Sequence, residues 1–586
     1  MTAGLQDITT PGGLLLVLAV LLPVIGLLAG LVLGGRHARS AALVTIAAGL
    51  AVALAVADAV LVSGGTLVYL MGGWAPPLGV LLRADGLSAA MMLAAAVVVA
   101  GIAVYAGRDF GTARGEPESR RSLAFWLLLL AVWSGLNLVF VTRDLFTGYV
   151  ALEMLTFAAV PLVCLDGKGE TIRAALRYLL FALAGSMLYL LGVFLLYGMY
   201  GTVDMALLAE RAGPDVTTIA AIALLTLGLA AKTALFPLHL WLPPAHSGAP
   251  PAASAILSGL VVKGSWFLVV RIWLDVFPGV VTVTSAELLA AFGAAAILAG
   301  NLVALRQQRL KLLVAYSTVA QIGYLFVMFP LAAGLTAAGL DDAPARSAGL
   351  LQAVSHALAK AAMFMAAGLI YKSVGHDRIA ELAGSARAMP LTLLTFALAG
   401  IALMGLPPGG AYAAKKLFFD STAATGLGWL EVVLNAGAFL TAGYTVLVLA
   451  HALRPASALL KLESRPSRVG ELSALALALA SLLLGCAAAD MIPGASLAGA
   501  FTPAGILSAL LILAGGVAIA GAFGLQLPWA GRGGGPAAAL VALRRLTVAV
   551  GVLVVRADGA LRQWPVATTT LLLAALAFAA VIAAGT

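Results

Sequence analysis

The feature that most constrains this chain is a series of apolar runs, each of roughly 20 residues, that fills the sequence from Pro11 onward. A helix of that length crosses the ~30 Å hydrocarbon core of a bilayer. Charged residues make up 10% of the chain, well below the roughly 25% typical of soluble domains. The sequence therefore predicts an all-α polytopic membrane protein and leaves no stretch for a soluble catalytic domain.

Gly, Pro and charged clusters separate the runs and predict about sixteen membrane helices, of which about fourteen form the core. The first run, from Gly12 to about Leu33, is longer than a signal-peptide core, and we interpret it as a membrane helix. The expected spans are 11–34, 41–62, 85–107, 122–141, 144–165, 172–198, 217–243, 250–271, 284–305, 310–333, 348–371, 390–419, 428–453, 470–489, 503–525 and 566–585.

The basic residues predict the orientation, because Lys and Arg collect in cytoplasmic loops. One set of loops holds most of them: Arg36, Arg39, Arg108, Arg114, Arg120, Arg121, Lys168, Arg173, Arg177, Arg306, Arg309, Lys311, Lys372, Arg378, Arg387, Arg454, Lys461, Arg465, Arg468, Arg532, Arg544, Arg545, Arg556 and Arg562. The opposite set holds only Arg83, Arg143, Arg211, Arg271 and Arg346. The first set is therefore predicted to be cytoplasmic, with both termini on the outer, periplasmic face of a cell inner membrane.

The composition also excludes several classes of function. The net charge of +9 is spread over many short loops, which does not favour a nucleic-acid partner. Cys164 and Cys486 lie far apart in apolar segments, so they do not supply the roughly four ligands of an iron–sulfur or structural zinc site. Without a phosphate-binding loop or dinucleotide fingerprint, we expect no cofactor and no metal, and no catalytic site marks the chain itself as an enzyme.

Charged residues at membrane depth are the main candidates for function, since each costs at least a few kcal/mol there. The five remaining basic residues, Lys232, Lys263, Lys360, Lys415 and Lys416, all lie inside predicted spans. Glu153 lies about midway through the span 144–165. Its carboxyl group is therefore expected either to be protonated or to pair with a cation. Lys232 is the expected partner.

Two predicted helices are interrupted by proline and glycine, and each carries a lysine. Lys232 begins KTALFPLHLWLPPAH, in which Pro237 interrupts the helix and His239 and His246 follow. In GLPPGGAYAAKKLFF, the prolines and glycines precede Lys415 by one or two turns. A broken helix frees backbone carbonyls for ions or water where it lines a cavity, and paired broken helices mark the ion path of many transporters.

The other candidates lie between these breaks. Lys263 is in the middle of its span, and His356 and Lys360 are four residues apart on one helix face. Buried lysines and histidines can load and release protons near neutral pH. Together with water, Glu153, Lys232, Lys263, His356, Lys360 and Lys415 would form a proton relay, with His239 as a further proton-transfer candidate.

Structural roles are the alternatives for the same residues. Glu153 and Lys232 would then be a buried pair retained for specificity, and Lys263 would extend to the interface. Interfacial or capping positions are the alternative for seven further charged or histidine residues: Lys360, Lys415, Lys416, His246, Asp58, Asp144 and Asp490.

Residues 85–455 resemble the antiporter-type proton-translocating membrane subunits of respiratory complex I (its L, M and N subunits), Mrp sodium/proton antiporters (their A and D subunits) and membrane-bound hydrogenases. The most specific segments are KTALFPLHLWLPPAHSGAPPAASAILSGLVVK, LRQQRLKLLVAYSTVAQIGYL, SHALAKAAMF and GLPPGGAYAAKK. The stretch AYAA and Gln321 depart from the pattern, which makes the outer half of the exit path less well defined.

The resemblance implies two inverted five-helix repeats, at 122–275 and 276–455, between N-terminal helices at 1–121 and a C-terminal part at 456–586. It implies that Glu153 is the ion-pair glutamate, Lys232 the proton-carrying lysine and Lys263 the connecting lysine. His356 and Lys360 would form the central relay. A lysine at Lys415 is more similar to the Mrp D-type or the complex I N-type subunit.

The segment from Pro536 to Trp564 is Arg-rich on an apolar background. A helix of this length reaches only about 40 Å, shorter than the lateral helix of the distal complex I subunit, and an amphipathic surface anchor is the simplest interpretation.

The expected function is proton translocation within a multi-subunit complex in the lipid bilayer, driven by a change in the Glu153–Lys232 distance. The expected partners are other membrane subunits, with iron–sulfur redox subunits among the candidates and H⁺ or Na⁺ as the transported ion. The alternatives are a Na⁺/H⁺ antiporter module without a redox partner, a membrane subunit of inorganic-carbon uptake, and a non-conducting scaffold.

Overall fold

A computed structural model describes residues 9–34, 37–112, 119–455, 460, 462–523 and 535–585 of the chain. Arg36, Arg114, Lys461 and Arg532 of the predicted cytoplasmic set lie outside the described residues, and the side chain of Arg544 is not described. Within the described part, 15 helices are long and apolar enough to cross a membrane. The prediction of an all-α polytopic membrane protein is therefore confirmed.

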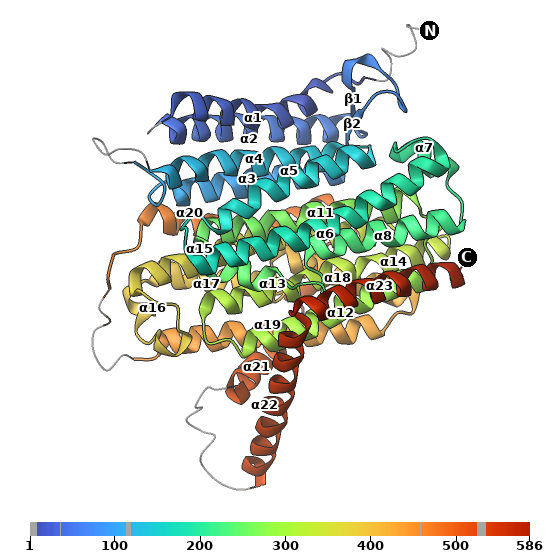
Figure 1. Ribbon diagram of the computed structural model, residues 1–586. Coiled ribbons are helices and arrows are strands. Elements are labelled where there is room, and N and C mark those ends of the chain that lie inside the picture. Colours follow the sequence, from blue (N-terminus) through green and yellow to red (C-terminus); the bar gives the residue numbers. More distant parts are fainter. Residues whose placement is uncertain are drawn as a thin grey trace. The chain divides into compact units, whose positions relative to one another are not determined.

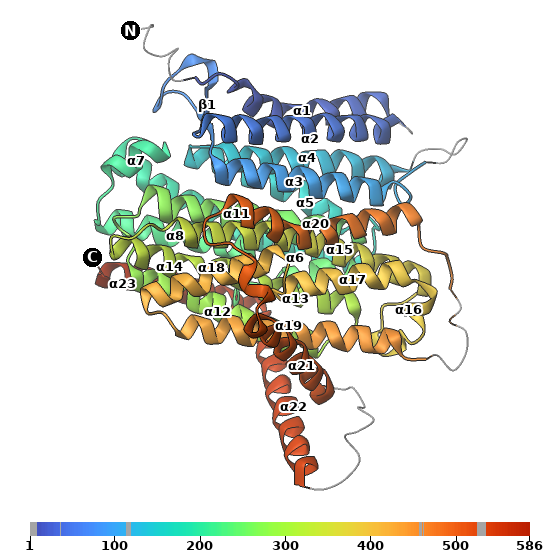
Figure 2. The ribbon, with the colours of Figure 1, turned by 180° about the vertical axis from the view of Figure 1, so that it is seen from behind.

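Contacts divide the chain into two compact units. Unit 1 contains residues 1–234, 248–288 and 571–586, and unit 2 contains residues 235–247 and 289–570. Figures 1 and 2 show the helices of both units, coloured from blue at the N-terminus to red at the C-terminus.

Unit 1 is built from long apolar helices, with α1 packed on α2 and α4, and α6 packed on α8. Its helices are α1 (Leu14–Leu33), α2 (His37–Ser63), α3 (Gly86–Ala106), α4 (Arg120–Val141), α5 (Leu145–Val163), α6 (Gly169–Tyr200), α7 (Met205–Arg211), α8 (Val216–Thr233), α10 (Pro251–Ile256) and α11 (Val262–Val270). Asp85, Asp144, Asp204 and Asp215 precede α3, α5, α7 and α8, and each accepts a hydrogen bond from a backbone N–H of the first turn.

Two π-helical segments, Leu257–Val261 and Arg271–Val276, extend α10 and α11 into one continuous span over Pro251–Val276. A π-helical turn widens the helix and frees backbone groups from the regular hydrogen-bond ladder. Nearly all of this span is buried within the chain, including every residue of the first π segment.

A short hairpin of β1 (Leu67–Leu70) and β2 (Leu81–Ala84) was not predicted. Its strands pair antiparallel with Leu67 opposite Ala84, and a 3-10 turn, Met71–Gly73, follows β1. Strands of four residues between two apolar spans carry too short an alternation to be distinguished from a loop.

Unit 2 has a second set of long helices, in which α15 packs on α17, α18 and α20, and α19 packs on α21. Its elements are α9 (Leu242–Gly248), α12 (Val283–Leu305), α13 (Leu310–Phe326), α14 (Met328–Ala337), α15 (Ala343–Val374), α16 (Ser385–Ala388), α17 (Pro390–Leu403), α18 (Gly410–Thr425), α19 (Trp429–Leu453), α20 (Arg468–Met491), α21 (Pro503–Phe523) and α22 (Gly535–Leu561), with 3-10 turns at Ile379–Glu381 and Ala498–Phe501. α9 ends in unit 1 and α12 begins in unit 1, and residues of the last helix, α23 (Trp564–Gly585), belong to both units.

Both predicted helix breaks are present. α8 ends at Thr233, and Ala234 adopts a left-handed conformation with φ 59° before the non-helical stretch that leads to α9. The predicted span 390–419 is divided into α17 and α18 by a non-helical turn that contains Pro407 and Pro408. Each break contains one cis X–Pro peptide bond, at Phe236–Pro237 and Pro407–Pro408.

The C-terminal extension contains the predicted helix. α22 covers Gly535–Leu561 and crosses the direction of the neighbouring unit 2 helices in both views. Its last turn is not a plain surface anchor, because Asp558 is buried against other elements of unit 2.

Candidate functional site

Lys232, at the C-terminal end of α8, lies in a polar pocket inside unit 1. Its Nζ donates hydrogen bonds to Glu153 Oε1 at 2.9 Å, to Thr156 Oγ1 at 2.9 Å and to Ser186 Oγ at 2.5 Å. Ser186 in turn donates to Glu153. The contact that the sequence predicted between Glu153 and Lys232 is present, and the two hydroxyl partners on α5 and α6 were not predicted.

Two glycines bring α6 and α8 close enough for this arrangement. A Cβ at Gly185 would lie 2.7 Å from the carbonyl oxygen of Gly228, and a Cβ at Gly228 would lie closer still to the carbonyl oxygen of Gly185. No larger residue fits such a backbone approach. Because Gly185 precedes Ser186 and Gly228 is one turn before Lys232, the close contact positions the hydroxyl against the ammonium.

A small, mostly apolar cavity adjoins this pocket. Its volume is about 10 Å³, and Thr156, Lys232 and Ser265 contribute polar groups to its lining. That volume is close to the minimum needed for one water molecule. Thr233 donates to Ser265 Oγ at 2.9 Å, so hydroxyl groups continue from the Lys232 pocket toward α11.

Lys263 is completely buried one residue into α11, directly after the first π segment. Its Nζ donates to the carbonyl oxygen of Ser258 at 2.5 Å. The π segment supplies that carbonyl, since its backbone departs from the regular helical ladder. The alternative in which Lys263 extends to the membrane interface is wrong, because no part of its side chain reaches the surface of the chain.

The central residues of unit 2 lie on α15. Lys360 is fully buried and donates to Ser317 Oγ and to the carbonyl of Val314 at 3.2 Å, both on α13. His356, one turn earlier, is also fully buried. Neither side chain is exposed at the surface of the chain.

His246 and Lys311 belong to the same part of unit 2. His246 on α9 is fully buried, stacks on Phe364 of α15 with ring centroids 4.7 Å apart, and lies within electrostatic range of both Lys311 and Lys360. Lys311 Nζ donates to the carbonyl of Ser247 at 3.4 Å. The surface alternative for His246 is wrong. Lys311, which the loop pattern placed among cytoplasmic bases, is buried in the first turn of α13.

Lys415 is half-buried on α18, beside a second cavity of about 10 Å³ whose lining includes Tyr324, Gln352 and Lys415. Gln352 Nε2 donates to Gln321 Oε1 at 3.0 Å, so the departure at Gln321 is part of a buried amide pair. Lys416 instead bonds the carbonyl of Gly494 at 2.9 Å in an exposed position, as its interfacial interpretation requires.

His239 lies outside the polar pockets described so far and has a partner that the sequence did not indicate. Its Nε2 is 2.7 Å from Asp558 Oδ1 on α22, and Tyr316 and Arg562 donate to Asp558 Oδ2 at 2.7 and 2.9 Å. Burial alone would raise the pKa of Asp558, but the hydrogen bond and charge of His239, with Arg562 and Tyr316, lower it. The sequence gives no indication that Asp558 is buried, because it is a single acidic residue in an Arg-rich stretch.

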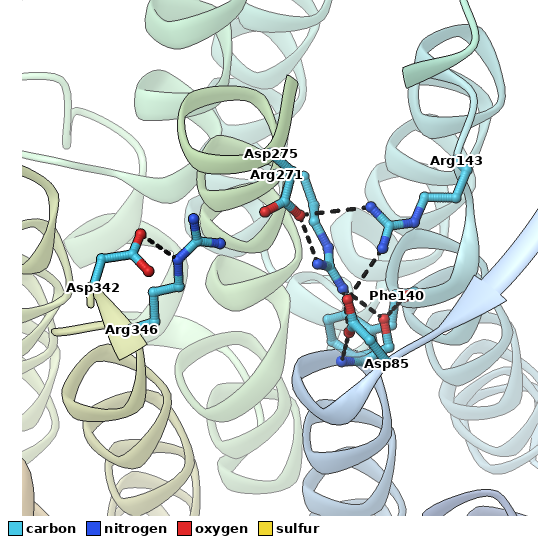
Figure 3. A network of polar contacts seen from close by, with 8 residues as sticks. Asp85, Phe140, Arg143, Arg271, Asp275, Asp342 and Arg346 are labelled. Atoms are coloured by element: carbon cyan, nitrogen blue, oxygen red, sulfur yellow. Dashed lines mark hydrogen bonds and ion pairs between the residues drawn. The ribbon is translucent and has the colours of Figure 1, made fainter. Parts of the chain in front are cut away.

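Four charged residues form a closed cluster at one end of unit 1, shown in Figure 3. Asp85 accepts hydrogen bonds from Arg271 at 2.5 Å and Arg143 at 3.1 Å, and Asp275 lies 2.7 Å from Arg271 and 3.6 Å from Arg143. We call these four residues the charge tetrad. The positive-inside pattern placed Arg143 and Arg271 in loops, yet both are buried.

Electrostatics within the tetrad favour the ionised form of Asp85. Burial would raise the pKa of Asp85, but hydrogen bonding and charge from Arg271, with Ser88 and Arg143, hold it well below the usual range. Burial, together with the charge of Arg271, lowers the pKa of Arg143 to about 10. Both groups therefore remain charged at neutral pH.

Comparison with known proteins identifies the family. Residues 142–441, which contain Glu153, Lys232, Lys360 and Lys415, match the family described as NADH:quinone oxidoreductase/Mrp antiporter, TM. The chain belongs to this family. The match does not extend to Asp85 or Asp558, so the tetrad and the α22 contact each lie partly outside the family region.

Relatives within the family include subunits of different complexes. The chain is 35% identical over 417 residues to the NADH-quinone oxidoreductase subunit N of Desulforudis audaxviator, which covers 70% of this chain and 80% of that protein. It is 30% identical to the D subunit of the Na(+)/H(+) antiporter of Alkalihalophilus pseudofirmus, over 60% of this chain and 69% of that protein. The family region is thus an antiporter-like membrane subunit of the type found in multi-subunit complexes.

Two solved structures have a similar fold. A chain of the membrane-bound sulfane sulfur reductase, an archaeal respiratory membrane complex, has 26% identity and a TM-score of 0.73, with 85% of this chain and 99% of that chain covered. A chain of the Mrp complex from Dietzia sp. DQ12-45-1b has a TM-score of 0.70 with the same coverage, and at 24% identity it supports the fold alone.

Proposed function

We propose that this chain translocates protons across the membrane as one subunit of a multi-subunit complex. The observation that carries the proposal is the Lys232 pocket, in which a buried ammonium contacts one carboxylate and two hydroxyl groups beside a cavity close to the size of one water molecule. A proton path needs space for water beside the ammonium, and a purely structural pair does not.

The physical basis is the sensitivity of a buried amine to its counter-charge. In a low-dielectric interior, a change of a few ångströms in the Glu153–Lys232 distance alters the interaction energy by several kcal/mol in order of magnitude. Such a movement would switch Lys232 between holding and releasing its proton. Thr156 and Ser186 would hold the ammonium in place while it is charged.

The buried groups of unit 2 are proposed as further transfer sites. Lys360, His356, His246 and Lys311 are buried inside unit 2. Lys415 adjoins a small cavity whose lining includes the polar side chains of Tyr324 and Gln352. In the proposed scheme each repeat, 122–275 and 276–455, contains one broken helix with a lysine, and Lys263 carries the proton onward from the first repeat. His239 is bound to Asp558, and we assign it a supporting role in place of direct transfer.

The complex must supply the energy, because the chain has no cofactor motif of its own. The named relatives are subunits of NADH-quinone oxidoreductase and of a Na(+)/H(+) antiporter. We propose membrane subunits of such a complex as partners, with redox subunits that carry iron–sulfur clusters or a countertransported Na⁺ as the source of energy. We further propose that both termini face the outer side.

The test is ion flux in vesicles that contain the whole native complex. We expect Lys232→Ala and Glu153→Gln each to abolish proton uptake, and Thr156→Val to reduce it about tenfold, because loss of one hydrogen bond to a charged group costs about 1.5 kcal/mol. Lys416→Gln is the control, since Lys416 contacts only the exposed carbonyl of Gly494 among the described residues.

The comparison is meaningful only if the four variants assemble, which native gel electrophoresis of the solubilised complex measures. Unchanged flux in Lys232→Ala and Glu153→Gln would show that the chain is a scaffold. Loss of Na⁺ movement together with H⁺ movement would favour the Na⁺/H⁺ antiporter alternative, and bicarbonate-dependent flux would favour the inorganic-carbon alternative.

A further inference from the structure

One cavity of unit 2 lies away from the lysine pockets, between α22 and the turn that joins α12 to α13. Its volume is about 550 Å³, and it is open to the surface. Three arginines line it, Arg306 and Arg309 from the turn and Arg556 from α22, together with Leu312, Val552 and Val555. Sites of this size commonly hold small organic ligands.

The charge of this cavity is positive and largely uncompensated. Arg309 bonds Asp377 through its Nε at 2.9 Å. Arg306 and Arg556 have no acidic partner among the described residues, and neither is fully buried. Arginine presents several donors in a planar fork that matches the oxygens of a phosphate group. The cavity therefore favours an anion that carries phosphate oxygens.

The position of the cavity also favours a ligand that has an apolar part. α12 ends at Leu305 and α13 begins at Leu310, so the three arginines border the ends of two membrane spans. Leu312, Val552 and Val555 are partly exposed on the cavity wall. A ligand that places phosphate against the arginines and hydrocarbon against these three side chains would satisfy both parts.

α22 packs closely against Arg306 beside the cavity. A Cβ at Gly551 would lie 3.1 Å from Arg306 Cδ, so glycine at this position lets α22 rest against the stem of that arginine. The Asp558 contacts with His239 and Tyr316 hold the same helix one to two turns further along. The cavity wall is thus fixed at both places.

From these observations we propose that this cavity binds the headgroup of an anionic phospholipid, with the acyl chains leaving along Leu312, Val552 and Val555. Basic pockets at the ends of membrane helices bind such headgroups in other membrane proteins. The lipid would join α22 to the α12–α13 turn. The inference does not depend on ion transport by the chain.

The test uses the whole complex in detergent with a photoactivatable phosphatidylglycerol that carries its reactive group near the headgroup. Mass spectrometry is expected to find cross-links on peptides that contain Leu312 or Val552. Arg306→Gln and Arg556→Gln should each weaken half-maximal labelling about fivefold, the factor that corresponds to ~1 kcal/mol per basic residue. Val555→Trp should block labelling with all three arginines retained.

Competition identifies the source of the phosphate group. Unlabelled phosphatidylglycerol should displace the probe, whereas phosphatidylcholine and inorganic phosphate should not. The matched control, Arg387→Gln, removes an exposed arginine from α16 and should leave labelling unchanged. Equal competition by inorganic phosphate, equal labelling in all variants, or cross-links from these residues only to another protein subunit would each overturn the proposal.

Discussion

Asp85 illustrates how one carboxylate depends on its surroundings. It caps the first turn of α3 through Ser88 and lies between Arg143 and Arg271 in the charge tetrad (Figure 3). Because its pKa in the folded protein is lower than the ordinary value of 3.8, the stability it contributes is fully present above that value. This stability is lost as the pH falls through the lowered pKa.

We therefore predict the pH dependence of Asp85→Asn. Its melting temperature should be lower than that of the wild type by a constant amount between about pH 5 and pH 8, equivalent to roughly 2 kcal/mol for a hydrogen bond to a charged group. The difference should narrow below about pH 4, where the wild type loses the same interaction. Scanning calorimetry of the detergent-solubilised protein measures it, with Asp420→Asn, an exposed carboxyl on α18, as control. A difference that grows in acid would contradict the sign.

At this scale the sequence predicts some residues well and misses others. The Glu153–Lys232 contact could be predicted, because a charge within an apolar run needs a partner at similar depth. Asp558 could not, since its partner His239 is 319 positions away and its own segment resembles a basic surface helix. The burial of Lys311 could not be predicted either, because a basic residue beside a loop has the same local pattern whether it faces water or a carbonyl inside the protein.

The C-terminal end of α22 is attached through a buried acidic residue. The buried carboxylate of Asp558 forms hydrogen bonds with His239, Tyr316 and Arg562. Replacing one partner of a buried charged network leaves the others without compensation, at a cost of about 3–5 kcal/mol. The last turns of α22 should then open far more often than in the wild type.

We predict that Asp558→Asn increases hydrogen exchange of backbone amides at residues 553–561 by at least tenfold, while helices of unit 1 exchange as before. Hydrogen–deuterium exchange of the assembled complex, read by mass spectrometry, measures the change. Asp490→Asn, at the exposed end of α20, provides the control for loss of one carboxylate. Unchanged protection at 553–561 would mean that other contacts hold α22.

Helix breaks were easier to predict than the hairpin. Pro237 and the pair Pro407 and Pro408 disrupt the helical hydrogen-bond ladder wherever they occur, and both breaks are present. The left-handed Ala234 was not expected, because only glycine adopts that conformation without cost. The strands β1 and β2 are too short for their alternation to stand out beside two long apolar spans.

The fold of the whole molecule is the level that the sequence predicts most fully. Span length and low charge decide it, and the fifteen long helices of the described chain follow the predicted spans closely. The distribution of arginines also predicts an orientation, which is a property of the chain in a membrane and not of its internal contacts. It therefore has to be measured in cells.

We predict the orientation with two single-cysteine variants in a Cys164→Ser, Cys486→Ser background. Glu210→Cys, exposed beside Arg211, should react with a membrane-impermeant maleimide applied to cells whose inner membrane is intact. Arg387→Cys, exposed on α16, should react only after the inner membrane is permeabilised. The cysteine-free chain shows the background. Labels in the reverse order would place both termini on the cytoplasmic side.

The link between His239 and Asp558 also affects how the protein is made. The ribosome adds about 5–20 residues per second, so the acceptor for His239 is synthesised roughly 15 to 60 seconds after the histidine itself, given a separation of 319 positions. During that interval the turn after α8 is already in the membrane without its carboxylate. Until α22 is in place, both His239 and Tyr316 lack the carboxylate that they contact in the folded chain.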